Sequence, residues 1–372
     1  MFWFSLSVDK RIPRSSAVIR DILTKLRRVC GKKQTMDSGG LLCYNEEKEG
    51  GMPVRELLEK LGRNHRLTTE EYTQLIRFRT PQLRQAADRT RRERWGTRVH
   101  LRGVLDVSSI CQHDCPHCSQ RCSADPSIRY RLRPREILDS CEEAWGLDIR
   151  SIVLRCGTDR FYGDEMICSI LEKLRRSCPG LAVTVAMGER SRRSYERLYN
   201  AGAEGYILLQ ETAERDRYED IHSESLSFDR RLHCLNEIRD VGFRTGCGFL
   251  MDLPGQTAQD LARELKFLEE FQPDAVELVP LAGEPEMRAR LIGLIRLILP
   301  DAVVTAPGND PGCVLAGANL VSAALSGCGG THPLCGGGPA GASAGVETLA
   351  ALRQELAGVG FEVDMSAVPW NG

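Results

Sequence analysis

Two rhythms of apolar and polar residues divide the chain near Gly96. Before it, apolar residues recur every three or four positions, which predicts helices over residues 53–61, 69–77 and 81–93. Pro81 suits the first turn of the last of these helices. After Gly96, short apolar runs rich in β-branched residues alternate with amphipathic segments, a pattern typical of a parallel sheet flanked by helices.

The runs after Gly96 predict eight strands, at residues 99–107, 151–154, 182–186, 205–209, 245–251, 275–279, 302–306 and 320–324. Helices are predicted near residues 134–145, 165–177, 191–200, 228–241, 257–271, 286–299 and 346–357. Eight strands alternating with helices indicate an α/β protein with a (β/α)8 TIM-type barrel, an open doubly wound sheet being the alternative. In such a barrel the chemistry lies just after the carboxyl ends of the strands.

The ends of the chain have other patterns. We expect residues 1–51 to form a flexible extension, 52–98 a helical lead-in, 99–325 the barrel, and 326–372 a Gly-rich loop, a helix and a tail. Within the extension, residues 16–31 predict a short basic amphipathic helix. That helix indicates a membrane-surface or targeting segment. The alternatives are a dispensable extension, or an over-long start with Met52 as the true first residue.

Composition excludes several classes of function. The chain has 372 residues, with 50 Lys and Arg against 51 Asp and Glu, so no overall field draws it to nucleic acid or a membrane. No uncharged apolar run approaches the ~18 residues of a membrane span. Fifteen cysteines in a chain of this length favour reduced thiols in the cytoplasm, some of them binding metal.

A cysteine motif follows the first predicted barrel strand. It reads Cys111-Gln-His-Asp-Cys115-Pro-His-Cys118, with the spacing C-x3-C-x2-C. A zinc ion would need a fourth ligand, for which His113, His117 and Cys122 are candidates. Three cysteines can instead bind three irons of an iron–sulfur cubane and leave the fourth iron open to a substrate or cofactor.

This motif resembles that of the radical S-adenosylmethionine (SAM) enzymes. Residues 52–325 further resemble the FeFe-hydrogenase maturase HydE, in a group with biotin synthase and methylornithine synthase. The similar segments begin Val99-His-Leu-Arg-Gly, Ile152-Val-Leu-Arg-Cys-Gly-Thr-Asp, Val183-Thr-Val-Ala-Met-Gly-Glu, Gln210-Glu-Thr, Ser227-Phe-Asp-Arg-Arg-Leu-His, Leu253-Pro-Gly-Gln-Thr and Gly317-Ala-Asn. The order and spacing of these segments carry the resemblance more than any one of them does.

The resemblance implies cofactors and their binding residues. A 4Fe–4S cluster is expected on Cys111, Cys115 and Cys118, with SAM cleaved reductively to a 5′-deoxyadenosyl radical. The residues expected to contact SAM are His117, Gly157, Thr158, Asp159, Glu211, Arg231 and Leu250. His117 replaces a residue that is usually aromatic in the family. For Glu211 and Arg231 a structural ion pair is the alternative, and for Leu250 and its neighbour Met251 the alternative is ordinary barrel core.

Some positions depart from the HydE pattern. Leu209 stands where HydE has an arginine that reaches into the cavity. Arg155 is expected to supply the missing positive charge, and Thr184 to face the substrate. The loop that begins at Leu281, after the sixth strand, is shorter than in HydE. A second iron–sulfur cluster is a further possibility, on the cysteines at Cys313, Cys328 and Cys335, which are otherwise incidental thiols.

The resulting hypothesis is a cytoplasmic HydE-like enzyme that assists assembly of the FeFe-hydrogenase H-cluster. Its expected partners are a small-molecule or small iron-complex substrate, a reductant such as ferredoxin or flavodoxin, and other hydrogenase maturation proteins. One alternative is a methylornithine-synthase-like mutase or another radical SAM synthase. The other is a non-catalytic iron–sulfur scaffold.

Overall fold

The computed structural model describes residues 35–36, 42–43, 52–78, 81–124, 129–281, 284–325 and 346–369. The chain divides into two units, Met1–Pro53 and Val54–Gly372. In the first, strands β1 (Thr35–Met36) and β2 (Leu42–Cys43) pair antiparallel. The basic helix and the Gly-rich loop predicted from the sequence lie outside the described residues, and the predicted domain boundaries stay predictions.

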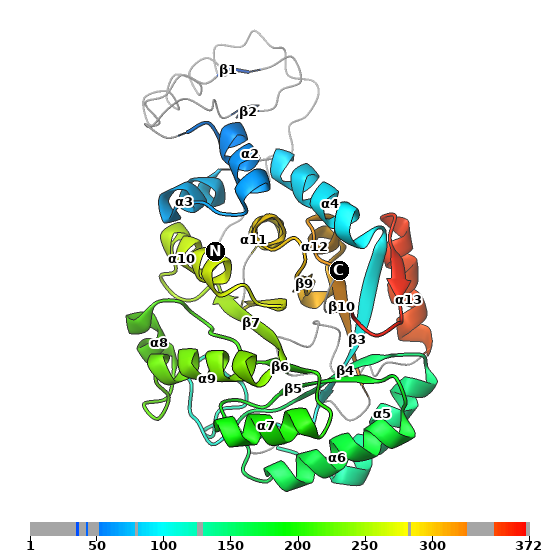
Figure 1. Ribbon diagram of the computed structural model, residues 1–372. Coiled ribbons are helices and arrows are strands. Elements are labelled where there is room, and N and C mark those ends of the chain that lie inside the picture. The colour runs from blue at the N-terminus through cyan, green and yellow to red at the C-terminus, as the bar shows by residue number, and fades with distance from the viewer. Residues whose placement is uncertain are drawn as a thin grey trace, which may run out of the picture. The chain divides into compact units, whose positions relative to one another are not determined.

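Three lead-in helices begin the second unit: α2 (Val54–Asn64), α3 (Thr69–Arg77) and α4 (Pro81–Trp95). A capping box starts α3, in which Thr68 and Glu71 each bond the other's backbone N–H. Helix α3 packs against α10 (Ala258–Phe271), and α4 packs against α11 (Pro285–Ile298). The lead-in helices therefore join one side of the helical shell of the barrel (Figure 1).

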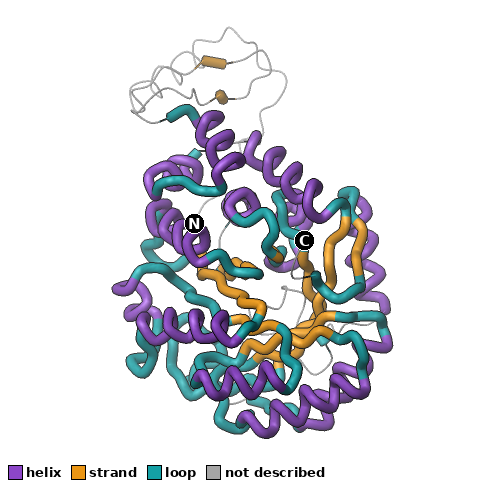
Figure 2. Tube along the Cα trace, viewed as in Figure 1, coloured by secondary structure: helices purple, strands orange, loops and turns teal. Residues whose placement is uncertain are grey.

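Eight parallel strands form the barrel, as predicted. They are β3 (Arg98–Asp106), β4 (Ser151–Arg155), β5 (Ala182–Ala186), β6 (Gly205–Ile207), β7 (Arg244–Met251), β8 (Ala275–Pro280), β9 (Val303–Val304) and β10 (Leu320–Ala324). Each strand pairs with the next, and β10 pairs back with β3. A parallel bridge between Thr305 and Leu320 joins the short β9 to β10 and closes the ring. The (β/α)8 prediction is therefore confirmed (Figure 2).

Helices connect the strands on the outside. Besides α10 and α11 they are α5 (Pro134–Gly146), α6 (Asp164–Ser177), α7 (Arg192–Asn200), α8 (Arg215–Ile221), α9 (Phe228–Val241) and α12 (Pro311–Leu315), with α13 (Val346–Gly358) after the last strand. The sequence did not predict α8, α12 or the final strand β11 (Glu362–Asp364). These elements are seven residues or fewer, too short for a clear periodic signal.

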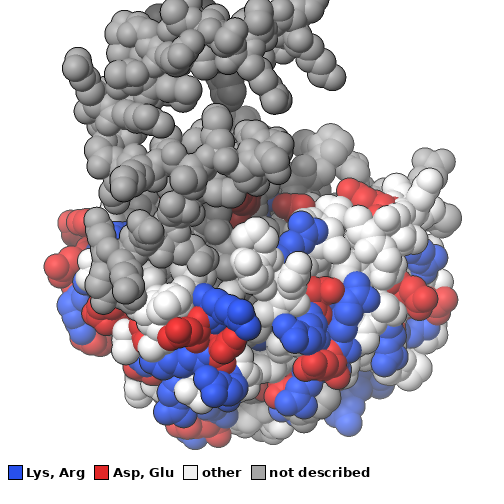
Figure 3. All heavy atoms as spheres, turned by 90° about the horizontal axis from the view of Figure 1, so that it is seen from above, with Lys and Arg blue, Asp and Glu red and all other residues white. Residues whose placement is uncertain are grey.

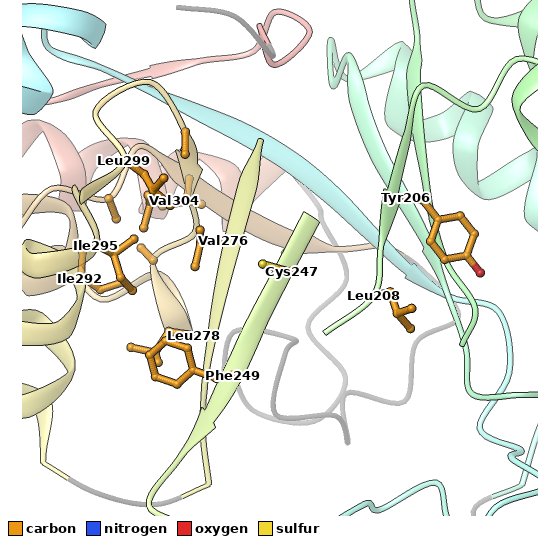
Figure 4. Close-up of a cluster of buried hydrophobic side chains, with 14 of the residues drawn as sticks. Tyr206, Leu208, Cys247, Phe249, Val276, Leu278, Ile292, Ile295, Leu299 and Val304 are labelled. Atoms are coloured by element: carbon orange, nitrogen blue, oxygen red, sulfur yellow. The ribbon is translucent and has the colours of Figure 1, made fainter. Parts of the chain in front are cut away.

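The main core lies between the strands and the helical shell. Figure 4 shows Ile292, Ile295 and Leu299 of the α11 segment beside Val304 of β9. Because helices cover the outer face of each strand and side chains fill the lumen, the strands are buried on both faces. This is why they read in the sequence as continuous apolar runs rather than as alternating ones.

The amino-terminal end of the barrel is closed. Trp95, Ala275, Val303, Leu320 and Val368 form a separate buried cluster there. The tail of the chain takes part in it, since β11 pairs parallel with β3 and the backbone N–H of Val368 donates to Ser151 Oγ at 2.8 Å. The tail predicted after the last helix is thus an ordered part of the fold that packs against the amino-terminal end of the barrel.

The surface carries charges of both signs. Figure 3 shows Lys and Arg interspersed with Asp and Glu over the visible part of one face. Among the described residues, no helix combines the length and the apolar character needed to cross a bilayer.

Candidate active site

The cysteine motif lies on a long loop at the carboxyl end of β3. Its neck is closed by an antiparallel bridge between Ser108 and Arg131. The backbone N–H of Ser109 donates to Tyr130 O, and the N–H of Tyr130 donates to Ser109 Oγ at 2.8 Å. These bonds fix both ends of the loop to the top of the barrel.

Arg129 fills the inside of this loop. Its guanidinium donates to the carbonyl oxygens of Ser109, Gln120, Arg121 and Ala124, on both sides of the cysteine motif. One rigid fork of donors thus holds the two arms of the loop at a fixed separation. Sequence reasoning missed this residue, because nothing in the sequence marks it among the many other arginines.

The three cysteines differ in exposure. Cys115 is buried, while Cys111 and Cys118 are half-buried. Burial raises the pKa of the Cys115 thiol to about 11 and also raises the pKa of Cys118, although backbone hydrogen bonds from Ser223 and from Gln120 oppose these shifts. Thiolates in this setting need adjacent positive charge, which the irons of a cluster supply, so the donor set fits such a cluster.

The arrangement does not favour the zinc alternative. Within the described ranges, no three His, Cys, Asp or Glu side chains converge on one ion position. A cubane does not require that, because its three thiolates bind three different irons. Of the candidate fourth ligands, Cys122 is exposed, His113 bonds Ser225 through Nδ1 at 2.8 Å, and His117 is held by other groups.

The loop after β4 lies directly against the cysteine motif. A Cβ on Gly157 would fall 2.6 Å from Cys111 Cβ and 2.9 Å from its Sγ. Gln112 N–H donates to Thr158 O at 3.0 Å, and Arg160 Nε donates to the Gln112 side chain at 2.9 Å. Gly157 therefore permits the close approach of this loop to the first cysteine, and its predicted contact with SAM stays a prediction.

Asp159 uses its carboxylate within the protein. It accepts two hydrogen bonds from the Arg131 guanidinium, at 2.8 and 3.0 Å, and one from Ser108 Oγ at 2.7 Å. Burial opposes ionisation, but the hydrogen bonds from Arg131 and Ser108 outweigh it and hold the pKa of Asp159 below its usual value. This residue ties the β4 loop to the base of the cysteine loop, and its predicted contact with SAM stays a prediction.

Glu211 is the centre of a polar cluster at the end of β6. Its backbone has a positive φ of 67°, and it bridges to Phe249 of β7. His222 Nε2 lies 2.5 Å and His117 Nε2 3.4 Å from the same carboxylate oxygen. Burial alone would raise the pKa of Glu211, but the two histidines and the charge of Arg231 hold it well below the usual range.

The two histidines are oriented by backbone carbonyls. His117 Nδ1 donates to Ile221 O at 3.0 Å, and His222 Nδ1 donates to Tyr218 O at 2.8 Å. Burial lowers the pKa of His117, but its hydrogen bond to Glu211 more than compensates, so the pKa lies above its usual value. His222 was missed from the sequence because it ends the short, polar helix α8.

Arg231 lies in the first turn of α9 beside the same cluster. Its Nε donates to Glu189 at 2.8 Å, its Nη1 donates to Leu209 O, and Nη1 lies 3.9 Å from Glu211. Burial opposes the charge, but Glu211 and Glu189 outweigh it, and the pKa of Arg231 is raised. The cluster thus holds carboxylates, a guanidinium and two imidazoles at one place, a set of donors and acceptors that suits a ligand bearing both an ammonium and a carboxylate group.

The residues considered for substrate binding differ in their contacts and in their burial. Arg155 donates to Asp106 at 2.6 and 2.9 Å, so its charge is matched by a carboxylate. Thr184 is buried on β5 and pairs in register with Val153, a lumen residue. Leu209 is half-buried and adjoins two apolar clusters in the upper lumen.

Two further predicted residues lie on opposite faces of β7. Leu250 packs in the upper lumen with Leu253 and Val279, where it can line a ligand. Met251 packs in the outer core instead. Cys313, one of the three cysteines considered for a second cluster, is fully buried in the same outer core, and the other two lie outside the described residues. The second cluster therefore stays a prediction.

Comparison with known proteins identifies the family of this chain. A model of the radical SAM superfamily matches residues 105–268. The FeFe-hydrogenase maturase subunit HydE of Thermotoga maritima is 31% identical over 294 residues, covering 73% of this chain and 83% of that protein. The 3-methylornithine synthase of Methanosarcina acetivorans is 24% identical, over 72% of this chain and 82% of its own length.

Solved structures share the fold. The crystal structure of methylornithine synthase superposes with a TM-score of 0.72 and 20% identity, covering 83% of this chain and 97% of that one. The maturase HydG superposes with a TM-score of 0.72 and 18% identity, covering 85% of this chain and 77% of that one. At these identities the structures establish the barrel and no finer property.

The barrel, the three-cysteine loop and the polar cluster around Glu211 together define an iron–sulfur enzyme of the SAM-cleaving type. The chain belongs to the radical SAM superfamily, and its relatives include the maturase HydE, methylornithine synthase and biotin synthase. The family uses a 4Fe–4S cluster and SAM, which are therefore its cofactors. Enzymes of this family act on small molecules and draw electrons from a reductant.

Proposed function

We propose that this protein is a HydE-like maturase that cleaves SAM reductively during assembly of the FeFe-hydrogenase H-cluster. The observation that carries the proposal is the cysteine loop packed on Gly157, in a chain that is 31% identical to HydE over 73% of this chain and 83% of HydE. When bound, the cluster and SAM supply reductive cleavage of a sulfonium, the source of the 5′-deoxyadenosyl radical.

Different residues of the protein have different roles in this proposal. Cys111, Cys115 and Cys118 would hold three irons, and Arg129 keeps their loop at a fixed width. Glu211 would accept from the ammonium or a ribose hydroxyl of SAM, and Arg231 would bind its carboxylate. The apolar upper lumen excludes water from the place where the radical forms.

The first experiment tests SAM cleavage. The protein is reconstituted with iron and sulfide without oxygen and given SAM and dithionite, and 5′-deoxyadenosine is measured by chromatography. Cys111→Ala should abolish the product. Cys122→Ala is the matched control, because Cys122 lies exposed on the same loop outside the motif and should retain the activity. Equal product from wild type and Cys111→Ala, or none from wild type, contradicts the proposal.

The second experiment tests the maturase role. The protein replaces HydE in cells that express an FeFe hydrogenase and its other maturation proteins, and hydrogen evolution is measured. Evolution restored by wild type and not by Cys111→Ala supports the role. Loss of evolution with intact SAM cleavage would exclude the maturase role and keep the enzyme class. We expect ferredoxin or flavodoxin to be the natural electron donor.

A methylornithine-synthase-like reaction is the second candidate. It is favoured by Leu209, which lacks the positive charge that HydE has at this position. It is also favoured by the match to methylornithine synthase over 82% of that enzyme. Mass spectrometry for 3-methylornithine after incubation with SAM, reductant and amino acids separates the two candidates.

A further inference from the structure

The backbone that carries the Glu211 side chain is fixed on both sides. The N–H of Glu211 donates to Gly248 O at 3.0 Å, and its carbonyl accepts from the N–H of Leu250 at 2.9 Å. The preceding bond of this ladder runs from Leu208 N–H to Gly246 O at 2.9 Å, so three residues on one side span two on the other. Such a β-bulge re-aims a side chain at the end of a strand. The place of the carboxylate then depends on what holds the side chain.

His222 is firmly anchored beside this carboxylate. It is 8% exposed, and its ring stacks on Tyr218 with the centroids 3.7 Å and the planes 17° apart. Nδ1 of His222 donates to Tyr218 O at 2.8 Å, and Nε2 lies 2.5 Å from Glu211 Oε2. Because the pKa of Glu211 lies well below its usual range, the carboxylate is ionised and the hydrogen of this bond belongs to Nε2. Both ring nitrogens of His222 are therefore donors.

The other neighbours hold Glu211 less closely. His117 Nε2 lies 3.4 Å from Oε2, and Arg231 Nη1 lies 3.9 Å from Oε1. The guanidinium of Arg231 also serves Glu189 and Leu209 O. The Glu211 side chain is 20% exposed, and no hydrogen bond from the part of the chain that the structure describes occupies Oε1. One carboxylate oxygen is thus held by the protein, and the other is open to a ligand.

The short helix α8 supports His222. Tyr218 is fully buried within this helix, and His222 caps its carboxyl end. Arg217 of the same helix donates to Asp260 of α10 at 3.1 Å and to two backbone carbonyls of the loop that precedes α10. The guanidinium of Arg231 lies 5.4 Å from the centre of the Tyr218 ring. One buried ring therefore fixes the position of His222 relative to Arg231, and the helix that carries it is tied to the barrel.

We propose that His222 is a positioning residue for SAM binding. It donates to Glu211 Oε2 and thereby keeps Oε1 turned toward the ammonium or ribose of SAM. His222 acts through Glu211 and not by contact with SAM. This role rests on the proposed function, since it requires the proposed contact between Glu211 and SAM.

The test compares two amides at this position. The amide nitrogen of asparagine takes the place of a histidine Nδ1 and that of glutamine the place of Nε2, so His222→Gln can still donate to Glu211 whereas His222→Asn cannot. SAM binding to the reconstituted protein without reductant is measured by equilibrium dialysis. His222→Asn should weaken binding about tenfold or more, because a hydrogen bond to a charged group is lost, and His222→Gln should stay within about threefold of wild type. Unchanged binding in His222→Asn, or an equal loss in both variants, overturns the proposal.

Kinetics and a control variant distinguish positioning from structural support. In His222→Asn the KM for SAM should rise about tenfold while kcat changes by less than about threefold, since the contact between Glu211 and SAM is the same before and during cleavage. A fall in kcat with an unchanged KM would overturn the proposal. His233→Asn is the control, because the side chain of His233 is 61% exposed on α9, and it should match wild type. Iron per chain and melting temperature are measured for each variant.

A double-mutant cycle tests whether His222 acts through Glu211. In the Glu211→Gln background, His222→Asn should change SAM binding by less than about twofold. A tenfold loss in both backgrounds would overturn the proposal. His222→Phe, which keeps the stack on Tyr218 and has no donor, takes the place of His222→Asn if the latter does not fold. Failure of the cycle with intact 5′-deoxyadenosine formation in wild type would leave the proposed function standing, whereas wild type that binds no SAM would overturn both.

Discussion

Gly157→Ala should damage the cluster site selectively. The new Cβ would lie 2.6 Å from Cys111 Cβ, about 0.8 Å short of the 3.4 Å at which ordinary contact begins. Neither atom is the end of a flexible side chain, so the cysteine loop must move away. Overpacking of this kind costs about 1–3 kcal/mol, which lowers the melting temperature by only a few degrees. We expect the barrel to fold while iron and sulfide per chain and 5′-deoxyadenosine formation fall sharply.

The assay has a matched control on the same loop. Gly163 has φ −66° and no atom within 4 Å of its virtual Cβ, so Gly163→Ala meets no obstacle. Both variants are reconstituted together, with iron, sulfide, circular dichroism and SAM cleavage measured on each. If Gly157→Ala retains as much cluster and activity as Gly163→Ala, the close packing of this loop on Cys111 does not govern the site.

Three further predictions concern buried groups. Burial raises the pKa of Glu264 from 4.5 to about 7. The protonated carboxyl therefore stabilises the folded state fully below pH 4.5, and this contribution of up to about 3 kcal/mol is lost as pH rises through 7. Glu264→Gln should remove this part of the pH dependence of thermal unfolding between about pH 5 and 8. Arg296→Met should lower unfolding stability by about 3 kcal/mol or more, since its buried guanidinium serves several backbone carbonyls, and the exposed Arg94→Met should change it by less than about 1 kcal/mol in the same denaturation assay. Cys313→Ala should leave bound iron unchanged, and a loss of about four irons per chain would instead reveal a second cluster.

Much of the barrel was predictable because its signals are local. Each strand is a short apolar run, and helix starts such as Thr257, which caps α10 with Asp260, carry their signal within three or four residues. The cysteine motif and its position after β3 followed from spacing alone. The short elements α8 and β11 gave no such signal, since their positions depend on contacts made after folding.

The partners of the site residues were not predictable in the same way. Asp159 was predicted to contact SAM, and the structure adds that its carboxylate accepts hydrogen bonds from Arg131 and Ser108, which are 28 and 51 residues away in the chain. His222 joins Glu211 through an eleven-residue connection that has no motif. Such pairings depend on the tertiary contacts between loops at the carboxyl end of the barrel. A local pattern of residue types does not predict those contacts.

The apolar cluster of Trp95 and Val368 determines the end of the barrel by which ligands can enter and leave. Because this cluster closes the amino-terminal end of the barrel, we expect ligands to enter from the carboxyl end of the strands, where we propose that SAM binds. A substrate that reacts deeper in the lumen has to pass this end before SAM occupies it. We therefore expect ordered binding, with the substrate before SAM, and release in the reverse order.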